Sequence, residues 1–150
     1  MEAILIAPAR RGDSPRLAAM SRRLVESGLD PCWTAERIER HCRHPDSVVL
    51  TARAAGSICG FAIMQYGDDA AHLNLLAVEP FHQRQGIGRR AMGLLRGEVW
   101  PHGKRLVVEA LCANAPAIAF WRAMGYRDYS LCLEILPEPR GEAAPGSGPA

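Results

Sequence analysis

The stretch from residue 71 to residue 100 constrains the fold more than any other part of the chain. The run AHLNLLAV (71–78) has the composition of a buried strand, and GIGRRAMGLLRGEVW (86–100) has apolar residues at helical spacing. Between them, the loop QRQGIGRR (83–90) carries two glycines among arginines. A strand that passes through a glycine-rich loop into a helix is typical of a sheet with helices packed on its faces.

The rest of the chain predicts a regular alternation of elements. Strands are expected at 3–8, 47–54, 57–67, 71–78, 104–111 and 126–136, and helices at 14–28, 34–43, 86–100 and 116–125. Ser14 and Thr34 are the expected helix N-caps, and Ala55-Gly56 is the expected turn of a hairpin. The order β-α-α-β-β-β-α-β-α-β predicts an α/β (α+β) fold with a mixed sheet and helices on its faces.

The length and the charge of the chain limit its class. It has 150 residues, 48% of them hydrophobic, which suits one domain with its own core. We expect this domain over residues 1–136 and a flexible Pro-, Gly- and Ala-rich tail over residues 137–150. A net charge of +2 gives no field that favours nucleic acid or an anionic membrane. Since neither a signal peptide nor a membrane span is recognisable, we expect a cytoplasmic protein.

The cysteines argue against a disulfide framework. There are five of them, an odd number, with no CxxC pair: Cys32, Cys42, Cys59, Cys112 and Cys132. This pattern predicts reduced, mostly buried thiols and no metal site.

The glycine-rich loop has the chemistry of an anion site. The first turn of a helix offers unpaired N–H groups and the positive end of the helix dipole. Gly86 and Gly88 allow close approach of a backbone to an oxygen because they lack a Cβ, and Arg84, Arg89 and Arg90 add planar guanidinium donors. A pyrophosphate is the expected guest. The alternative is a turn whose arginines are merely solvated.

A dinucleotide fingerprint also matches this loop. The stretch from Gly86 to Ala91 satisfies G-x-G-x-x-A, and Glu109 follows Gly86 by 23 residues, where a ribose-binding acid is expected. However, seven residues separate Val78 from Gly86, whereas the first glycine of that fingerprint normally follows its strand closely. Several strands also precede the loop, and too few residues follow it for a doubly wound sheet. A nicotinamide dinucleotide is therefore disfavoured.

A known family fits better. The stretch LNLLAVEPFHQRQGIGRRAMGLL resembles the signature of the Gcn5-related N-acetyltransferases (GNAT), whose cofactor loop reads Q/R-x-x-G-x-G/A and would here be residues 83–88. The companion motif of this family is an Asn, an Ala-rich helix and an aromatic–x3–Gly–aromatic ending. It matches Asn114, Ala117, Phe120, Trp121, Gly125 and Tyr126. The resemblance covers about residues 3 to 136 and is strongest to the ribosomal-protein alanine acetyltransferase-like branch.

The resemblance implies acetyl-CoA as co-substrate, with its pantetheine arm in a gap where strand 71–78 splays from the next strand. In such folds the backbone of the splayed strand pairs with the arm, the loop cradles the pyrophosphate, and an N–H near Val78 polarises the thioester carbonyl. An amine then attacks directly in a ternary complex. The implied cofactor-binding residues are Leu76, Ala77, Val78, Gln83, Arg84, Gln85, Gly86, Ile87, Gly88, Arg89, Asn114 and Trp121.

The resemblance identifies the residues that transfer protons less directly than it identifies the cofactor-binding residues. Several relatives carry a glutamate where this chain has His72, and an imidazole with an ordinary pKa of about 6.5 is a competent base. Glu109 is the second candidate base; either residue could instead be only a surface or salt-bridge group. Trp121 stands where many relatives place a tyrosine that protonates the leaving thiolate, and an indole cannot do this. Tyr126 or Tyr129 could replace it, or the thiolate could leave with hydrogen bonds alone.

The acceptor is less defined than the cofactor. In this family it is recognised by the first two helices and their connection, here residues 26–46, whose mixed charges favour neither an anionic nor a cationic acceptor. Trp33 would form a pocket wall or fill the gap between the helices. The expected function is N-acetyl transfer to a primary amine of a small molecule or a protein N-terminus. The alternative is a non-catalytic acyl-CoA-binding sensor or interaction module. An open sheet edge is compatible with a homodimer.

Overall fold

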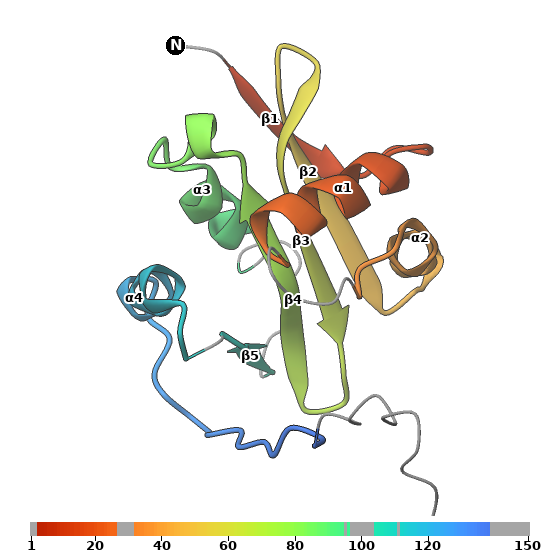
Figure 1. Cartoon of the computed structure of the whole chain (residues 1–150). Coiled ribbons are helices and arrows are strands. Elements are labelled where there is room, and N and C mark those ends of the chain that lie inside the picture. The colour runs from red at the N-terminus through yellow and green to blue at the C-terminus, as the bar shows by residue number, and fades with distance from the viewer. Residues whose placement is uncertain (1–2, 27–31, 95, 97–103, 111, 139–150) are drawn as a thin grey trace, which may run out of the picture. The chain divides into compact units, whose positions relative to one another are not determined.

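The computed structural model describes residues 3–26, 32–94, 96, 104–110 and 112–138. It divides into two compact units, one that ends at Asn114 and one that begins at Ala115. The elements of the first unit are β1 (Ile4–Pro8), α1 (Ser14–Leu24), α2 (Ala35–Arg43), β2 (Ser47–Ala54), β3 (Ser57–Tyr66), β4 (Ala70–Val78), the 3₁₀ turn η1 (Pro80–His82), α3 (Ile87–Leu94) and β5 (Arg105–Val108) (Figure 1). The second unit contains α4 (Ala115–Ala123).

The first unit is built on a five-stranded mixed sheet in the order β1-β2-β3-β4-β5. The first four strands pair antiparallel, and β5 runs parallel to β4. The predicted hairpin is confirmed, because β2 and β3 are joined by Ala55 and Gly56 at φ 51° and 84°. Two successive left-handed residues give the turn that matches the twist of the strands it joins. The predicted mixed sheet with flanking helices is thus confirmed.

The helices cover both faces of this sheet. Successive side chains of a strand point to opposite faces. On one face, Val49 of β2 lies in a buried cluster with Leu17 of α1 and Ile38 of α2. On the other face, Ala52 of β2 lies in a second cluster with Ile87 of α3. In Figure 1, α1 crosses in front of the strands and α2 lies to their right, while α3 lies to the left of β4.

The first two helices begin as their sequences dictate, with one correction. Thr34 caps α2 as predicted, since its hydroxyl accepts a hydrogen bond from the Arg37 N–H at 3.1 Å. The N-cap of α1, however, is Asp13 and not Ser14. Ser14 is already helical and buried, and its hydroxyl donates to the Glu39 carboxylate at 2.7 Å. Its hydroxyl is therefore used to join α1 to α2.

The second unit differs from the prediction at its C-terminal end. Gly125, at φ 99°, closes α4 as expected. The predicted strand over residues 126–136 is wrong, because this segment is described without regular structure. Its alternating apolar pattern fits a strand, but a strand is stable only against a partner, and the described part of this unit has no other strand. Its large apolar side chains are consequently exposed, namely Tyr129, Leu131, Leu133, Ile135 and Leu136.

Some predictions fall partly outside the described residues. The helix expected over 86–100 is described over Ile87–Leu94 and at residue 96, and most of the tail expected at 137–150 is not described. The expectation of mostly buried cysteines is wrong, since only Cys59 is buried and the other four are exposed. Among the described helices, none has the length and apolarity that crossing a bilayer requires.

Candidate functional site

One edge of β4 is paired over only half of its length. Parallel pairing with β5 begins at Ala70 and ends where Leu73 faces Val108. On the opposite edge, β3 stays paired with β4 as far as Val78, with a bulge near Asn74. Within the described strands, the second half of β4 therefore leaves the edge toward β5 open. This is the separation of strands that the resemblance implied.

The direction of the backbone groups on this edge follows from one hydrogen bond. The N–H of Glu79 donates to the carbonyl oxygen of Cys59 at 2.8 Å, which makes the facing residues Gly60 and Val78 a non-hydrogen-bonded pair. The N–H and C=O of Val78 therefore point away from β3, toward the open edge. By the alternation of an extended strand, the same holds for Leu76, whereas those of Ala77 point toward β3.

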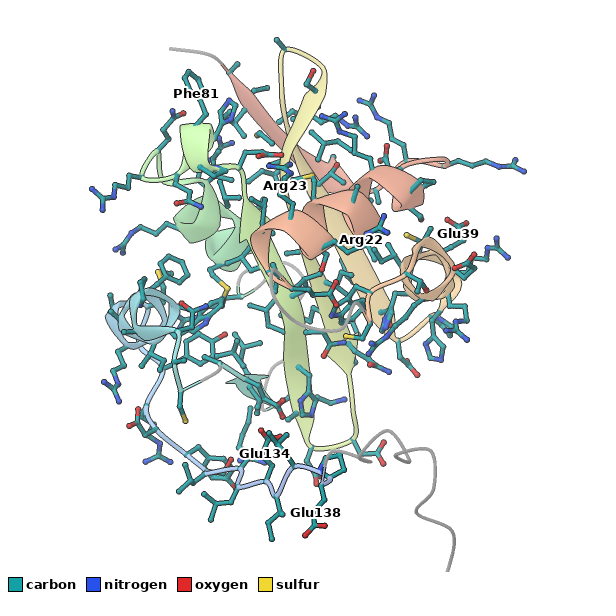
Figure 2. The ribbon with its side chains drawn as sticks, viewed as in Figure 1. Arg22, Arg23, Glu39, Phe81, Glu134 and Glu138 are labelled. Carbon is teal, nitrogen blue, oxygen red and sulfur yellow. The ribbon has the colours of Figure 1, made fainter. Side chains whose placement is uncertain are left out.

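The loop that follows β4 is fixed by its own glutamines. The side-chain amide of Gln83 donates to the carbonyl oxygen of Val78 at 2.9 Å. That of Gln85 donates to the carbonyl oxygen of Phe81 at 3.2 Å. The two amides hold the loop in shape, so contact of these residues with a ligand would fall to their backbone. Phe81 itself projects outward from the turn and is 84% exposed (Figure 2).

The backbone of the loop adopts an unusual conformation. Arg84 and Gly86 both have left-handed φ angles, 65° and 79°. A left-handed arginine costs about 1 kcal/mol, and such residues occur where a loop is shaped for a ligand. The space around Gly86 is open, with no atom within 4 Å of where a Cβ would stand. Helix α3 starts at Ile87, so its first N–H groups open onto this space.

The arginines of the loop do not all face the same way. Arg84 and Arg89 are exposed beside the open N-terminus of α3. The guanidinium of Arg90 instead donates to the carbonyl oxygen of Ile4 at 3.0 Å and ties α3 to β1. Arg90 therefore has a structural role, while its guanidinium keeps its positive charge. The positive charge near the loop comes from Arg84, Arg89, Arg90 and the helix dipole.

The two candidate bases lie near the point where β4 and β5 separate. His72 is exposed and faces Val107 in the parallel pair. Glu109 is exposed and follows the last residue of β5, two positions after Val107, or about 7 Å along the strand. If strand alternation continues by one residue, Glu109 lies on the same face as Val107 and hence as His72. The two side chains would therefore lie on the same face of the sheet.

Asn114 and Trp121 come from the junction and from the second unit. Asn114 is exposed and directly precedes α4. Within the second unit, the ring of Trp121 packs edge-on against Phe120 and Tyr126, with centroid separations of 4.9 and 5.4 Å. The indole therefore belongs to an aromatic cluster, which an aromatic residue of similar size would preserve.

The connection between α1 and α2 is anchored by a buried carboxylate. Glu26 is 6% exposed and accepts hydrogen bonds from the N–H groups of Cys32 and Trp33 at 2.8 and 3.0 Å. Burial alone would raise the pKa of Glu26, but these N–H donors hold it below its usual value. Trp33 is buried in the core with the Arg37 guanidinium 3.9 Å above its ring. Of the two roles considered for Trp33, the structure supports packing between the helices.

A basic hollow on α2 was not predicted. It is lined by Arg37, Arg40, His41, His44 and Gln65. The sequence contained a signal for it, because positions 37, 40, 41 and 44 have the i, i+3, i+4, i+7 spacing of one helix face. We refer to these five residues as the α2 hollow. No group of three or more potential metal-ligating side chains occurs in the part of the chain that is described.

Comparisons with known proteins agree with this geometry. A family model described as "Acetyltransferase (GNAT) family" matches residues 17–126. The [ribosomal protein bS18]-alanine N-acetyltransferase of Escherichia coli (strain K12) is 34% identical over 87 residues, which are 57% of this chain and 59% of that protein. The N-alpha-acetyltransferase RimI of Mycobacterium tuberculosis is 28% identical over 134 residues, 87% of this chain and 82% of that protein.

Solved structures share the fold. The crystal structure of the Escherichia coli ribosomal-protein-S18-alanine N-acetyltransferase superposes with a TM-score of 0.72 at 26% identity, covering 85% of this chain and 80% of that one. An aminoglycoside N-acetyltransferase in complex with CoA superposes with a TM-score of 0.68 at 14% identity, covering 92% and 97%. The second likeness concerns the fold alone.

Proposed function

Because the chain belongs to the acetyltransferase (GNAT) family, we propose that it transfers an acetyl group from acetyl-CoA to a primary amine. The acceptor is a small molecule or a protein N-terminus. The observation that carries this proposal is the open half of β4, where backbone groups of Leu76 and Val78 face outward directly before the glycine-rich loop. The relatives named as N-acetyltransferases support it.

The residues present fit a CoA thioester. The outward N–H and C=O groups of Leu76 can pair with the amide groups of a pantetheine arm as a neighbouring strand would. The carbonyl of Val78 already accepts from Gln83, so Val78 offers its N–H. The backbone from Arg84 to Arg89, with its open space at Gly86, would receive the pyrophosphate. Because buried side chains of β4 and α3 fix both elements in the core, these backbone groups would be held in place without rearrangement.

The chain would promote the reaction mainly by positioning. Acetyl-CoA supplies the acetyl group as a thioester. The Val78 N–H, aimed at the thioester oxygen, would stabilise the negative charge that develops there. Holding amine and thioester together contributes up to about 7–11 kcal/mol in favourable systems. Because His72 and Glu109 lie well before Val78 along the sheet, either one would take the proton from the ammonium form of the acceptor through a chain of waters. Asn114 would face the arm, as the family motif implies.

The test is acetyl transfer by the full chain. Acetyl-CoA would be incubated with a panel of small amines and peptides with free N-termini, and the released CoA thiol and the acetylated product would be measured together. We expect both to appear in equal amounts with at least one acceptor. Acetyl-CoA binding without any transfer would contradict the enzymatic proposal.

Two variants separate the candidate bases. His72→Ala and Glu109→Gln remove one candidate each from exposed positions, so neither should affect folding. Loss of the true base should lower kcat by about 100-fold or more and alter the dependence of the rate on pH. If neither variant changes the rate between about pH 6 and about pH 9, both assignments are wrong.

A further inference from the structure

The α2 hollow is positively charged and has no acid in its lining. Its volume is about 220 Å³, and four of its five lining residues are arginine or histidine. Gln65 of β3 completes it with an amide. A surface concavity lined by guanidinium and imidazole groups is suited to an oxyanion, because these groups supply charge and directed N–H donors together.

Two acids of this region, Glu39 and Glu26, have their partners outside the α2 hollow. Glu39 accepts from the Ser14 hydroxyl at 2.7 Å and from the Arg43 guanidinium at 3.2 Å, so it faces α1 (Figure 2). Glu26 is buried and accepts hydrogen bonds from the backbone of Cys32 and Trp33. Glu36 is exposed and does not line the hollow. The mixed charge of this region in sequence is therefore separated in space.

Each imidazole of the α2 hollow has a hydrogen-bond partner on one ring nitrogen. Nδ1 of His44 accepts the backbone N–H of Asp46 at 3.0 Å, so a neutral His44 carries its proton on Nε2. His41 lies 3.0 Å from the hydroxyl of Ser47. Burial lowers the pKa of His41, and electrostatic repulsion from the neighbouring Arg37 and Arg40 guanidinium groups lowers it further. A bound anion would relieve this repulsion.

The location of the α2 hollow relates it to the proposed reaction. Gln65 faces His72 across the strand pair and accepts from the Asn74 side chain at 3.4 Å. His72 precedes Val78 by six residues (78 − 72 = 6), or about 20 Å along β4. A small amine that reacts beside Val78 would not reach the hollow, whereas an extended peptide would reach it with about its sixth residue.

From this arrangement we infer that the α2 hollow binds acidic side chains of a polypeptide acceptor, several residues after the amine that is acetylated. The inference rests on the proposed function, because it takes the reacting end of β4 as the place of the amine. Carboxylates fit better than a nucleic acid backbone. The net charge of the chain is only +2, which gives no field that favours a nucleic acid backbone.

The experiment compares two peptides and two variants. Both peptides have about ten residues and begin with alanine; one carries glutamates from about the fifth position and its twin carries glutamines there. Each would be labelled at its C-terminus, and binding to the full chain would be followed by fluorescence anisotropy without acetyl-CoA. The variants are Arg40→Gln, within the hollow, and Arg43→Gln, which removes the same charge from the same helix outside it.

We expect the glutamate peptide to bind about tenfold more tightly than its twin, and Arg40→Gln to remove most of this difference while Arg43→Gln keeps it. Equal binding of the twins, or equal losses in the two variants, would overturn the inference. So would displacement of the peptide by a single-stranded RNA at lower concentration than by unlabelled peptide.

The same samples separate this inference from the proposed function. With acetyl-CoA added, Arg40→Gln should raise KM for the glutamate peptide and leave kcat unchanged. Selective binding without acetyl transfer would refute the proposed function and leave the carboxylate site. Transfer to both twins with equal KM would refute the carboxylate site and leave the proposed function.

Discussion

Gly60 of β3 lies so close to the carbonyl oxygen of Ala77 that a Cβ added at Gly60 would stand 2.9 Å from that oxygen. Real Cβ atoms do not approach a backbone oxygen this closely, so a side chain here must push β3 and β4 apart. Gly60→Ala should therefore lower the free energy of unfolding by about 1–3 kcal/mol. Urea denaturation of the variant and the wild type measures this difference.

The same displacement should weaken acetyl-CoA binding, since it moves the part of β4 that carries Val78. Gly93→Ala is the matched control, because nothing lies within 4 Å of a Cβ at this α3 position. The control should be neutral or slightly stabilising, as alanine favours helix. Equal stability of Gly60→Ala and wild type would show that β3 and β4 can accommodate a Cβ at residue 60, which would contradict this prediction.

Gly86→Ala tests whether the loop needs the left-handed backbone conformation at this position, because the added methyl group meets no neighbouring atom. Its surroundings are open, but its φ of 79° is unfavourable for a residue with a Cβ. We expect a cost of about 1–2 kcal/mol and a corresponding loss of affinity for acetyl-CoA, measured by calorimetry. Gly86→Asn should recover part of the loss, since asparagine tolerates the left-handed region better. If alanine and asparagine bind acetyl-CoA as glycine does, the left-handed conformation is not required.

The ion pair between Asp13 and Arg53 predicts a dependence of stability on pH. Their side chains are 13% and 11% exposed and 2.5 Å apart. Burial alone would raise the pKa of Asp13, but hydrogen bonds from Arg53 and from the Arg10 N–H hold it below the ordinary value of 3.8. A lowered folded-state pKa stabilises the fold above pH 3.8 and loses this contribution as the pH falls through the lowered value.

Asp13→Asn should therefore cost about 1–2 kcal/mol at neutral pH, and its difference from wild type should shrink below pH 3.8 in urea unfolding. Asp128→Asn is the control, because its pair with Arg122 is exposed and should contribute little. A difference for Asp13→Asn that stays constant down to about pH 2 would contradict the assigned ion pair.

Trp121 suggests a gain of function. It stands at the motif position where many relatives carry a tyrosine, and its ring packs between Phe120 and Tyr126. Trp121→Tyr keeps an aromatic ring and adds a phenol that can donate a proton to a departing thiolate. We expect kcat to rise by about tenfold, and Trp121→Phe to show no such rise. Equal rates for the two variants would mean that thiolate protonation does not limit the proposed reaction.

The parts of the fold that were predicted correctly from sequence are determined by residues that are neighbours in the sequence. Thr34 caps α2 with its own hydroxyl, and Ala55-Gly56 makes its turn through its own backbone angles. The segment 126–136 has an equally clear alternating pattern, but its state depends on a partner strand that the pattern does not contain. Local signals therefore predicted the hairpin turn and the cap of α2, although they misplaced the cap of α1 by one residue, and they failed where pairing is non-local.

The candidate site shows the same division. The open space at Gly86 follows from the missing Cβ and was expected, whereas its left-handed backbone was not predicted. The hydrogen bond from Arg90 to Ile4 joins residues that are far apart in the sequence, and the one from Gln83 to Val78 forms across a turn of the chain. Residue type alone did not reveal either contact. The α2 hollow required knowledge of which face of the helix meets β3, which charge counting over residues 26–46 cannot supply.

The central claim is that the loop after β4 holds the pyrophosphate of acetyl-CoA. Calorimetric titration of the full chain with acetyl-CoA tests it most directly, with NAD and the variant Gly86→Trp as comparisons. The account predicts roughly micromolar binding of acetyl-CoA to the wild type, and no binding of NAD or of acetyl-CoA to the variant. Absence of acetyl-CoA binding to the wild type, or undiminished binding to Gly86→Trp, would contradict it.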